Sequence, residues 1–142
     1  MFLSHSVDSK KNPLCWEKKV FYFKQFFPES PIVESCAVKT VEDAIRYMET
    51  LGFKDIMMIV GEDRVNQFQW IENYKTDYKI DRFKIVSAGK RDTNAGGVVG
   101  ATASKARQYV KDGDFEGFKA IIPGERDHAA VLYHDLKKYL EN

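Results

Sequence analysis

The sequence is poor in several features that mark particular classes of protein. Among its 142 residues are 2 cysteines, Cys15 and Cys36, too few for a disulfide framework, and no CxxC motif or histidine cluster suggests structural zinc. We therefore expect both to be buried thiols.

The chain also has no large excess of one charge. The 22 basic and 21 acidic residues leave a net charge of +1, so no general positive field favours DNA or acidic membranes. Nucleic acid is not expected as a partner, and any basic site must be local.

Long apolar runs are also missing. No run approaches the roughly 20 residues that cross a bilayer, and the opening residues, MFLSHSVDSKK, lack the basic start and apolar stretch of a secretory signal. We therefore expect no membrane partner and a cytoplasmic location. With 44% hydrophobic and 13% aromatic residues, the chain is too apolar to be disordered, and we expect one globular domain over residues 1–142.

Apolar runs alternate with helical patterns along the chain, which predicts an α/β fold with a mostly parallel sheet covered by helices. Strands are expected at residues 1–3, 32–37, 55–60 and 83–88, and helices at 13–27, 41–51, 65–74, 102–112, 114–122 and 127–140. The run at 55–60 is almost entirely apolar, which is typical of a central strand buried on both faces.

Two helix starts are marked by their capping residues. Asn12 is expected to cap the first helix, with Pro13 in its first turn. Thr40 and Asp43 have the spacing of a capping box, which predicts the start of the second helix. The buried stripe of the first helix is expected to comprise Trp16, Val20, Phe23 and Phe27.

The first candidate for ligand binding follows the strand at 55–60, because open α/β sheets bind ligands at the carboxyl ends of their strands. Gly61 would let a ligand approach the backbone, Asp63 would accept hydrogen bonds from a sugar or base, and Arg64 would add a cation. The alternative, equally compatible with the spacing, is that Asp63 only caps the next helix.

The second candidate is the helix start Gly100–Arg107. Thr102, Ser104, Lys105 and Arg107, together with the free amides of the helix terminus, are suited to holding a polyphosphate. The alternative is an ordinary helix cap with solvated cations, and the pattern alone slightly favours it.

Further cations lie in two other loops. Lys10 and Lys11 follow the first apolar stretch, and Arg91 follows the strand at 83–88. Exposed lysines are more often merely solvated, but a parallel sheet brings its strand ends to one edge, where these cations would face the same anion.

The histidines and phenylalanines do not indicate a further site. The spacing of the three histidines predicts no metal site, and the phenylalanines between 21 and 27 are expected in the core rather than as a platform for bases.

Several segments resemble phage-type nucleotidyltransferases of the cytidylyltransferase-like superfamily, which includes nicotinamide-nucleotide adenylyltransferase-like proteins. The resemblance covers nearly the whole chain, in SHSVDSKKNPL (4–14), VGEDRV (60–65), SAGKRD (87–92), ASKAR (103–107), GDFEGF (113–118) and Pro123. It implies a Rossmann-like, three-layer α/β/α fold and attack of a phosphate-type acceptor on the α-phosphate of a nucleoside triphosphate, which binds with Mg²⁺, with release of pyrophosphate.

The resemblance also implies roles for particular residues. Residues 102–107 match an ISSTxIR-type motif imperfectly, with Ala103 and Ala106 as departures, and Ser104 and Arg107 keep the positions that hold the triphosphate. Asp63 matches the acidic position of a GxD motif. We assign Lys11 and Arg107 as the catalytic candidates, because this transfer depends on charge stabilisation.

One departure from the family is large. Its HxGH motif is absent, and His5 lacks the HxGH spacing, so the chain is expected to begin at the family's second strand, without the first central strand. Catalysis would then require an HxGH-bearing segment from a partner polypeptide. The alternative function is a non-catalytic phage structural or interaction protein that retains the fold and uses its open sheet edge to bind a partner or a second copy. For a phage-encoded protein, the location would be the host cytoplasm.

Overall fold

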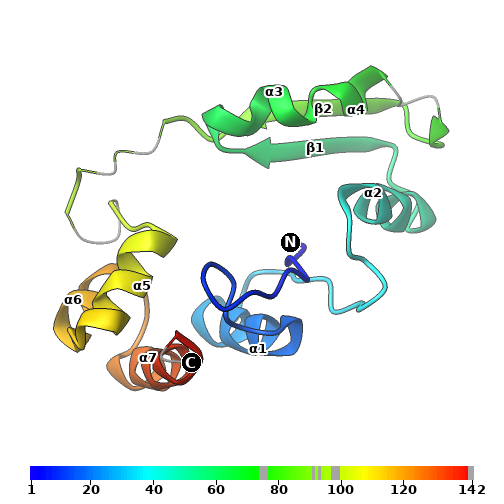
Figure 1. Ribbon diagram of the computed structural model, residues 1–142. Coiled ribbons are helices and arrows are strands. Elements are labelled where there is room, and N and C mark those ends of the chain that lie inside the picture. Colours follow the sequence, from blue (N-terminus) through cyan, green and yellow to red (C-terminus); the bar gives the residue numbers. More distant parts are fainter. Residues whose placement is uncertain (74–76, 91, 93, 97–99, 141–142) are drawn as a thin grey trace. The chain divides into compact units, whose positions relative to one another are not determined.

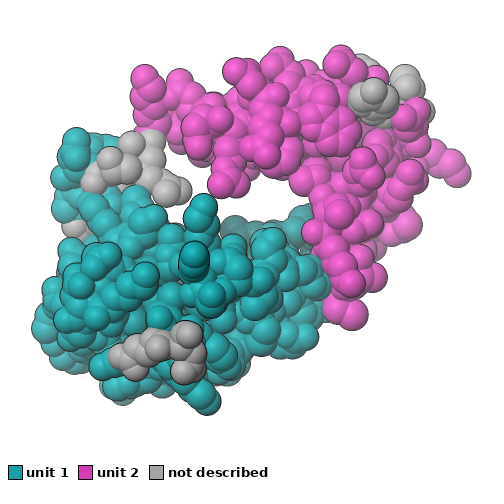
Figure 2. All heavy atoms as spheres, viewed as in Figure 1, with its two compact units in different colours: residues 1–34, 92–142 teal, residues 35–91 magenta. Residues whose placement is uncertain are grey.

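The computed structural model describes residues 1–73, 77–90, 92, 94–96 and 100–140. They form two compact units, coloured separately in Figure 2: unit 1 comprises residues 1–34 and 92–142, and unit 2 comprises residues 35–91. A single domain over residues 1–142 stays a prediction.

Unit 1 contains four helices in its described residues: α1 (Trp16–Phe26), α5 (Ala103–Asp112), α6 (Phe115–Ile121) and α7 (Arg126–Leu140) (Figure 1). The predicted helices at the carboxyl end of the chain are confirmed, and local chemistry sets their limits. Thr102 accepts a hydrogen bond from the Lys105 amide at 3.0 Å and caps α5. Gly113, at a φ of 74°, ends α5 in the left-handed conformation. Asp114 then caps α6 through the Gly117 amide at 2.8 Å.

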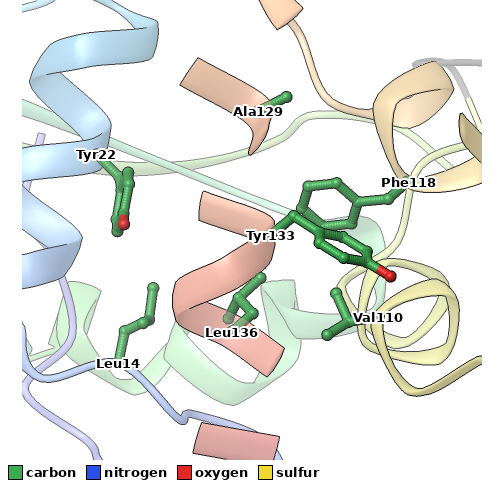
Figure 3. Close-up of a cluster of buried hydrophobic side chains, with 7 residues drawn as sticks. All are labelled: Leu14, Tyr22, Val110, Phe118, Ala129, Tyr133 and Leu136. Carbon is green, nitrogen blue, oxygen red and sulfur yellow. The ribbon is translucent and has the colours of Figure 1, made fainter. Parts of the chain in front are cut away.

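The core of unit 1 is an apolar cluster to which all four helices contribute. Phe118 is completely buried, and its ring meets the edge of the Tyr133 ring at a centroid distance of 5.3 Å. Figure 3 shows the seven buried members: Leu14, Tyr22, Val110, Phe118, Ala129, Tyr133 and Leu136. Since these side chains come from both sequence segments of unit 1, burial of apolar surface joins the two segments.

The start of α1 differs from the prediction. The helix begins at Trp16 with Cys15 as its N-cap, not at Asn12. Asn12 is instead paired with Asp8, whose amide donates to the Asn12 carbonyl at 2.9 Å, while the Asn12 amide donates back at 3.2 Å. This turn holds Asn12 outside the helix, and the N-cap lies three residues further on, at Cys15.

The buried face of α1 also differs from the predicted stripe. Val20 and Tyr22 are its buried residues, whereas Phe21 and Phe27 are 55% and 43% exposed. Tyr22 faces α7, where its hydroxyl donates to Asp135 at 2.5 Å. Because this polar contact orients Tyr22 inward, the helix presents a different face from the one that apolar spacing alone favours.

Unit 2 contains α2 (Val41–Thr50), β1 (Asp55–Val60), the short 3₁₀ helix η1 (Glu62–Arg64), α3 (Val65–Phe68), α4 (Trp70–Asn73) and β2 (Arg82–Ser87). The capping box at the start of α2 is confirmed: the Asp43 amide donates to the Thr40 hydroxyl at 3.1 Å, and the Thr40 amide donates to the Asp43 carboxylate at 2.9 Å. The predicted helix at 65–74 is present as two short helices, α3 and α4, which lie along β2 in Figure 1.

The sheet of unit 2 is parallel, as predicted, and has two strands in the part of the chain that the structure describes. β1 pairs with β2 in a register that runs from Asp55 opposite Arg82 to Val60 opposite Ser87. One face packs on the helices in a second apolar cluster, whose buried members are Ile45, Ile71, Ile80 and Phe83. The fold is therefore mixed α/β.

The predicted burial of β1 on both faces is wrong. Its residues alternate between exposed and half-buried, and Met57 and Ile59 are 60% and 67% exposed. Ile56 and Met58, on the other face, pack against the unit 2 cluster. An apolar run shows that a strand is apolar on both sides, but it does not show that both sides are covered.

The strands predicted at 1–3 and 32–37 are not present. The two segments meet through a hydrogen bond from the Val33 amide to the Met1 carbonyl at 2.9 Å, but no strand forms. Pro31 has no amide to donate, and a turn from Ser35 to Val38 ends the extended run, so the segment between them is too short for a ladder.

Two smaller findings concern the cysteines and the membrane. Cys15 is half-buried at the start of α1, and Cys36 is exposed in the turn after residue 35, so the expectation of two buried thiols is wrong. Within the described ranges, none of the helices combines the length and apolarity that a bilayer span requires.

Candidate functional site

The loop of residues 8–12, which we call the basic turn, is organised by one carboxylate. Asp8 Oδ1 accepts the amides of Lys10 at 3.0 Å and Lys11 at 2.6 Å, and Oδ2 accepts the Asn12 side-chain amide at 2.7 Å. These hydrogen bonds, the Lys11 amide first, lower the pKa of Asp8 from 3.8 to about 2. The carboxylate is therefore ionised near neutral pH and holds the backbone that presents the two lysines.

Both lysines of the basic turn are exposed. In the described parts of the chain, neither ammonium group has a hydrogen-bond or ion-pair partner. The ammonium group of a lysine is a point charge at the end of a flexible side chain. When the backbone is held in place, the side chain can still move to bring the ammonium group to a phosphate oxygen. Lys10 and Lys11 are thus available to an anion, although solvation alone accounts equally for their exposure.

Arg107 connects the basic turn to α5. Its Nη1 donates to the Lys11 carbonyl at 3.0 Å, and its Nη2 donates to the Ser104 hydroxyl at 3.2 Å. The carbonyl and the guanidinium belong to residues 96 positions apart. One planar side chain therefore places the basic turn beside the first turns of α5, and the turn and the helix start share one surface of unit 1.

The helix start itself is closely built. The Thr102 hydroxyl caps the helix, and Lys105 Nζ donates to the Gly100 carbonyl at 3.2 Å. A side chain at Gly100 would place its Cβ 1.7 Å from the Ala95 carbonyl oxygen, so only glycine fits there. For Thr102, the interpretation as an ordinary helix cap is confirmed.

The residue types on this surface are those that suit an oxyanion ligand. Lys10, Lys11, Lys105 and Arg107 contribute four cationic side chains, and the first amides of α5 have no acceptor within the helix. Asp8 is the carboxylate that organises the turn, and both of its oxygens already accept hydrogen bonds. The cationic side chains of Lys10 and Lys11 are exposed, which suits a ligand with several negative charges.

In unit 2, the candidate residues Gly61, Asp63 and Arg64 follow the carboxyl end of β1. A Cβ at Gly61 would lie 2.7 Å from Asp63 Oδ1, so the carboxylate takes the space that the glycine leaves. Neither η1 nor α3 has a side-chain cap, so the alternative interpretation of Asp63 as a helix cap is wrong. Asp63 and Arg64 are exposed, and their binding of a ligand stays a prediction.

The structure brings part of the predicted site together. Lys10, Lys11, Thr102, Ser104, Lys105 and Arg107 all lie in unit 1, on the basic turn and the start of α5. Gly61, Asp63 and Arg64 lie in unit 2, and Arg91 lies outside the described residues. The convergence of all these residues on one pocket stays a prediction.

Asp8 is the organising residue that the sequence interpretation missed. An aspartate followed within four residues by amides that bond back to it is typical of an Asx turn, and the pattern Asp-Ser-Lys-Lys-Asn at 8–12 is such a signal. The proline after Asn12 was instead interpreted as the first turn of a helix, which gave the turn residue a capping role.

The described residues contain no group of three or more histidine, cysteine, aspartate or glutamate side chains placed to hold an ion. The two oxygens of Asp8 are occupied by amides, so this carboxylate does not fit a role as a Mg²⁺ ligand. His5 instead stacks on Trp16 at a centroid distance of 4.9 Å, which agrees with a structural role.

Comparisons with known proteins give no relative. No family model, no curated protein and no solved structure matches this chain.

Proposed function

We propose that this chain is a nucleotidyltransferase-like protein that binds a nucleoside triphosphate, with the phosphates on the basic turn and the start of α5. The observation that supports this most is the double hydrogen bond of Arg107, to the Lys11 carbonyl at 3.0 Å and the Ser104 hydroxyl at 3.2 Å. It joins two cationic segments that the sequence separates.

The roles proposed for the residues follow from their chemistry. Lys10 and Lys11 neutralise phosphate oxygens as point charges, and Ser104 and the first amides of α5 donate hydrogen bonds to them. Arg107 positions the basic turn and adds its own charge. Since the surface does not fit a protein-held metal ion, Mg²⁺ would enter on the nucleotide's own phosphates.

The transfer reaction needs more than this surface. In the proposed reaction a phosphate-type acceptor attacks the α-phosphorus, the bond to the bridging oxygen breaks, and pyrophosphate leaves. Lys11 and Arg107 would stabilise charge on the phosphates. The HxGH motif that the resemblance requires would come from a partner polypeptide. In the complete assembly, the sheet would extend to a three-layer Rossmann-like fold.

Isothermal titration of the whole chain with ATP and CTP, each with magnesium, tests the binding. Arg107→Ala removes a charge-assisted contact worth about 1.5–3 kcal/mol, so affinity should fall roughly 10- to 100-fold. Lys111→Ala is the matched control, because it removes one exposed cation from the other end of α5 and should leave affinity unchanged. Absence of binding to both nucleotides, or equal binding by Arg107→Ala, would refute the proposal.

A second candidate is a non-catalytic structural or interaction protein. The exposure of Met57 and Ile59 on β1 favours it, since apolar side chains on a sheet are usually covered by another element. The titration discriminates between the two candidates, because an interaction protein has no reason to bind ATP or CTP.

A further inference from the structure

The outer edge of β1 presents an unused row of backbone groups. The Lys54 and Val60 carbonyls accept the amides of Arg82 at 3.1 Å and Ala88 at 2.8 Å, so this set of residues faces β2. Along a strand the direction of the backbone groups alternates, so Asp55, Met57 and Ile59 point theirs away from β2. Within the described residues these three have no backbone partner.

The same edge lacks the features by which a monomer prevents edge-to-edge pairing. β1 has no proline, bulge or lysine, and its one charged residue, Asp55, accepts two hydrogen bonds from Arg82 at 2.9 and 2.8 Å. The side chains of Met57 and Ile59 lie on the uncovered face of the strand, where they are 60% and 67% exposed. Backbone and side chains therefore both favour the addition of a strand.

The outer edge of β2 is different. There the Ile85 amide donates to the Glu72 carboxylate of α4 at 3.2 Å, so a side chain already occupies that edge. In the part of the chain that the structure describes, each copy thus has one open edge in its two-stranded sheet. Association through a single open edge per copy closes at two copies.

We propose that, when no partner polypeptide occupies this edge, β1 pairs in antiparallel fashion with β1 of a second copy of this chain, with the two Met57 residues facing each other on the two-fold axis. In this register Asp55 of each copy faces Ile59 of the other, so all three outward residues exchange both backbone hydrogen bonds. No like charges face each other, because the only charged residue in the strand is opposite an isoleucine.

Charge substitutions on the axis test this register, independently of nucleotide binding. The mass in solution of the whole chain is measured by size-exclusion chromatography with light scattering over a concentration series, and should approach twice 16.4 kDa. Met57→Lys and Met57→Glu each place two like charges face to face, so each variant should shift to 16.4 kDa. An equimolar mixture of the two variants pairs opposite charges and should restore the doubled mass.

Ile59→Lys is the matched control. It adds the same charge to the same edge, but in the proposed register the new lysine faces Asp55 of the other copy, so the doubled mass should remain. Met57 and Ile59 are both mostly exposed, and circular dichroism should show that all variants retain the wild-type helix content. A wild-type mass of 16.4 kDa at every concentration, species larger than two copies, or a mixture that stays at 16.4 kDa would overturn the proposal.

Discussion

Replacing Asp135 in α7 should loosen the attachment of α1, the helix that follows the basic turn. Asp135 Oδ2 accepts the Tyr22 hydroxyl at 2.5 Å and forms an ion pair with Lys18, so one carboxylate oxygen joins two residues of α1 to α7. Lys18 and Tyr22 lower the pKa of Asp135, whereas burial and the Asp135 carboxylate raise the pKa of Tyr22. Both shifts indicate that the pair is stable with Asp135 ionised and Tyr22 neutral.

The two contacts contribute differently. In Asp135→Ala the Tyr22 hydroxyl keeps only the distant Val131 carbonyl, at 3.5 Å, as an acceptor, and the loss of the shorter bond costs about 1–3 kcal/mol. The Lys18 and Asp135 side chains are 35% and 26% exposed, so their ion pair adds about 0–1 kcal/mol. Asp135→Ala should therefore lower the free energy of unfolding by about 1–4 kcal/mol. Asp135→Asn keeps an acceptor for Tyr22 and should cost about 1 kcal/mol.

Urea unfolding followed by circular dichroism measures these differences. Since the pKa of Asp135 is lowered from 3.8, its contribution is present at pH above that value and is lost as the pH falls through the lower folded-state pKa. The Ala variant should thus differ most from the wild type at neutral pH, and by less at a pH below the lowered pKa of Asp135, where the neutral carboxyl still accepts the Tyr22 hydroxyl but no longer pairs with Lys18. Equal losses in the Ala and Asn variants at pH 7 would contradict the assignment of most of the energy to the Tyr22 hydrogen bond.

Two further predictions concern the core and the basic turn. Phe118→Ala removes a fully buried ring and should lower the free energy of unfolding by about 3–5 kcal/mol, whereas Phe21→Ala, at an exposed position of α1, should cost less than about 1 kcal/mol in the same urea experiment. The basic turn should be intact above pH 3.8 and open as the pH falls through about 2, because the pKa of Asp8 is lowered to that value. Amide chemical shifts of Lys10 and Lys11 report the transition by NMR, and a midpoint near 3.8 would show that Asp8 does not hold the turn.

Features set by neighbouring residues were the most predictable from the sequence. The capping box at Thr40 and Asp43 and the Thr102 cap of α5 involve groups within three residues, so spacing alone identifies them. The strand at 55–60 was found by its apolar run and pairs in parallel with the next strand, as predicted. In each case the determining interaction is contained in the pattern itself.

Features set by distant residues were not predictable in this way. The choice of Tyr22 over Phe23 as a buried residue of α1 depends on Asp135 in α7, and the position of the basic turn depends on Arg107. The burial of β1 depends on which elements cover each face, which its own sequence does not encode. For Asn12, two local interactions compete. Its backbone pairs with Asp8, and this pairing places Asn12 in a turn and not at the N-cap of the helix.

The division of unit 1 into two sequence segments affects the order in which the molecule is assembled during synthesis. Residues 35–91 contain all the helices and strands of unit 2, so they can fold as soon as they leave the ribosome. They do so although they are synthesised after residues 1–34. The first 34 residues must wait for helices translated more than sixty codons later. In nascent chains arrested when unit 2 has left the ribosome but α5 has not, unit 2 should therefore resist protease while the amino-terminal segment is cleaved.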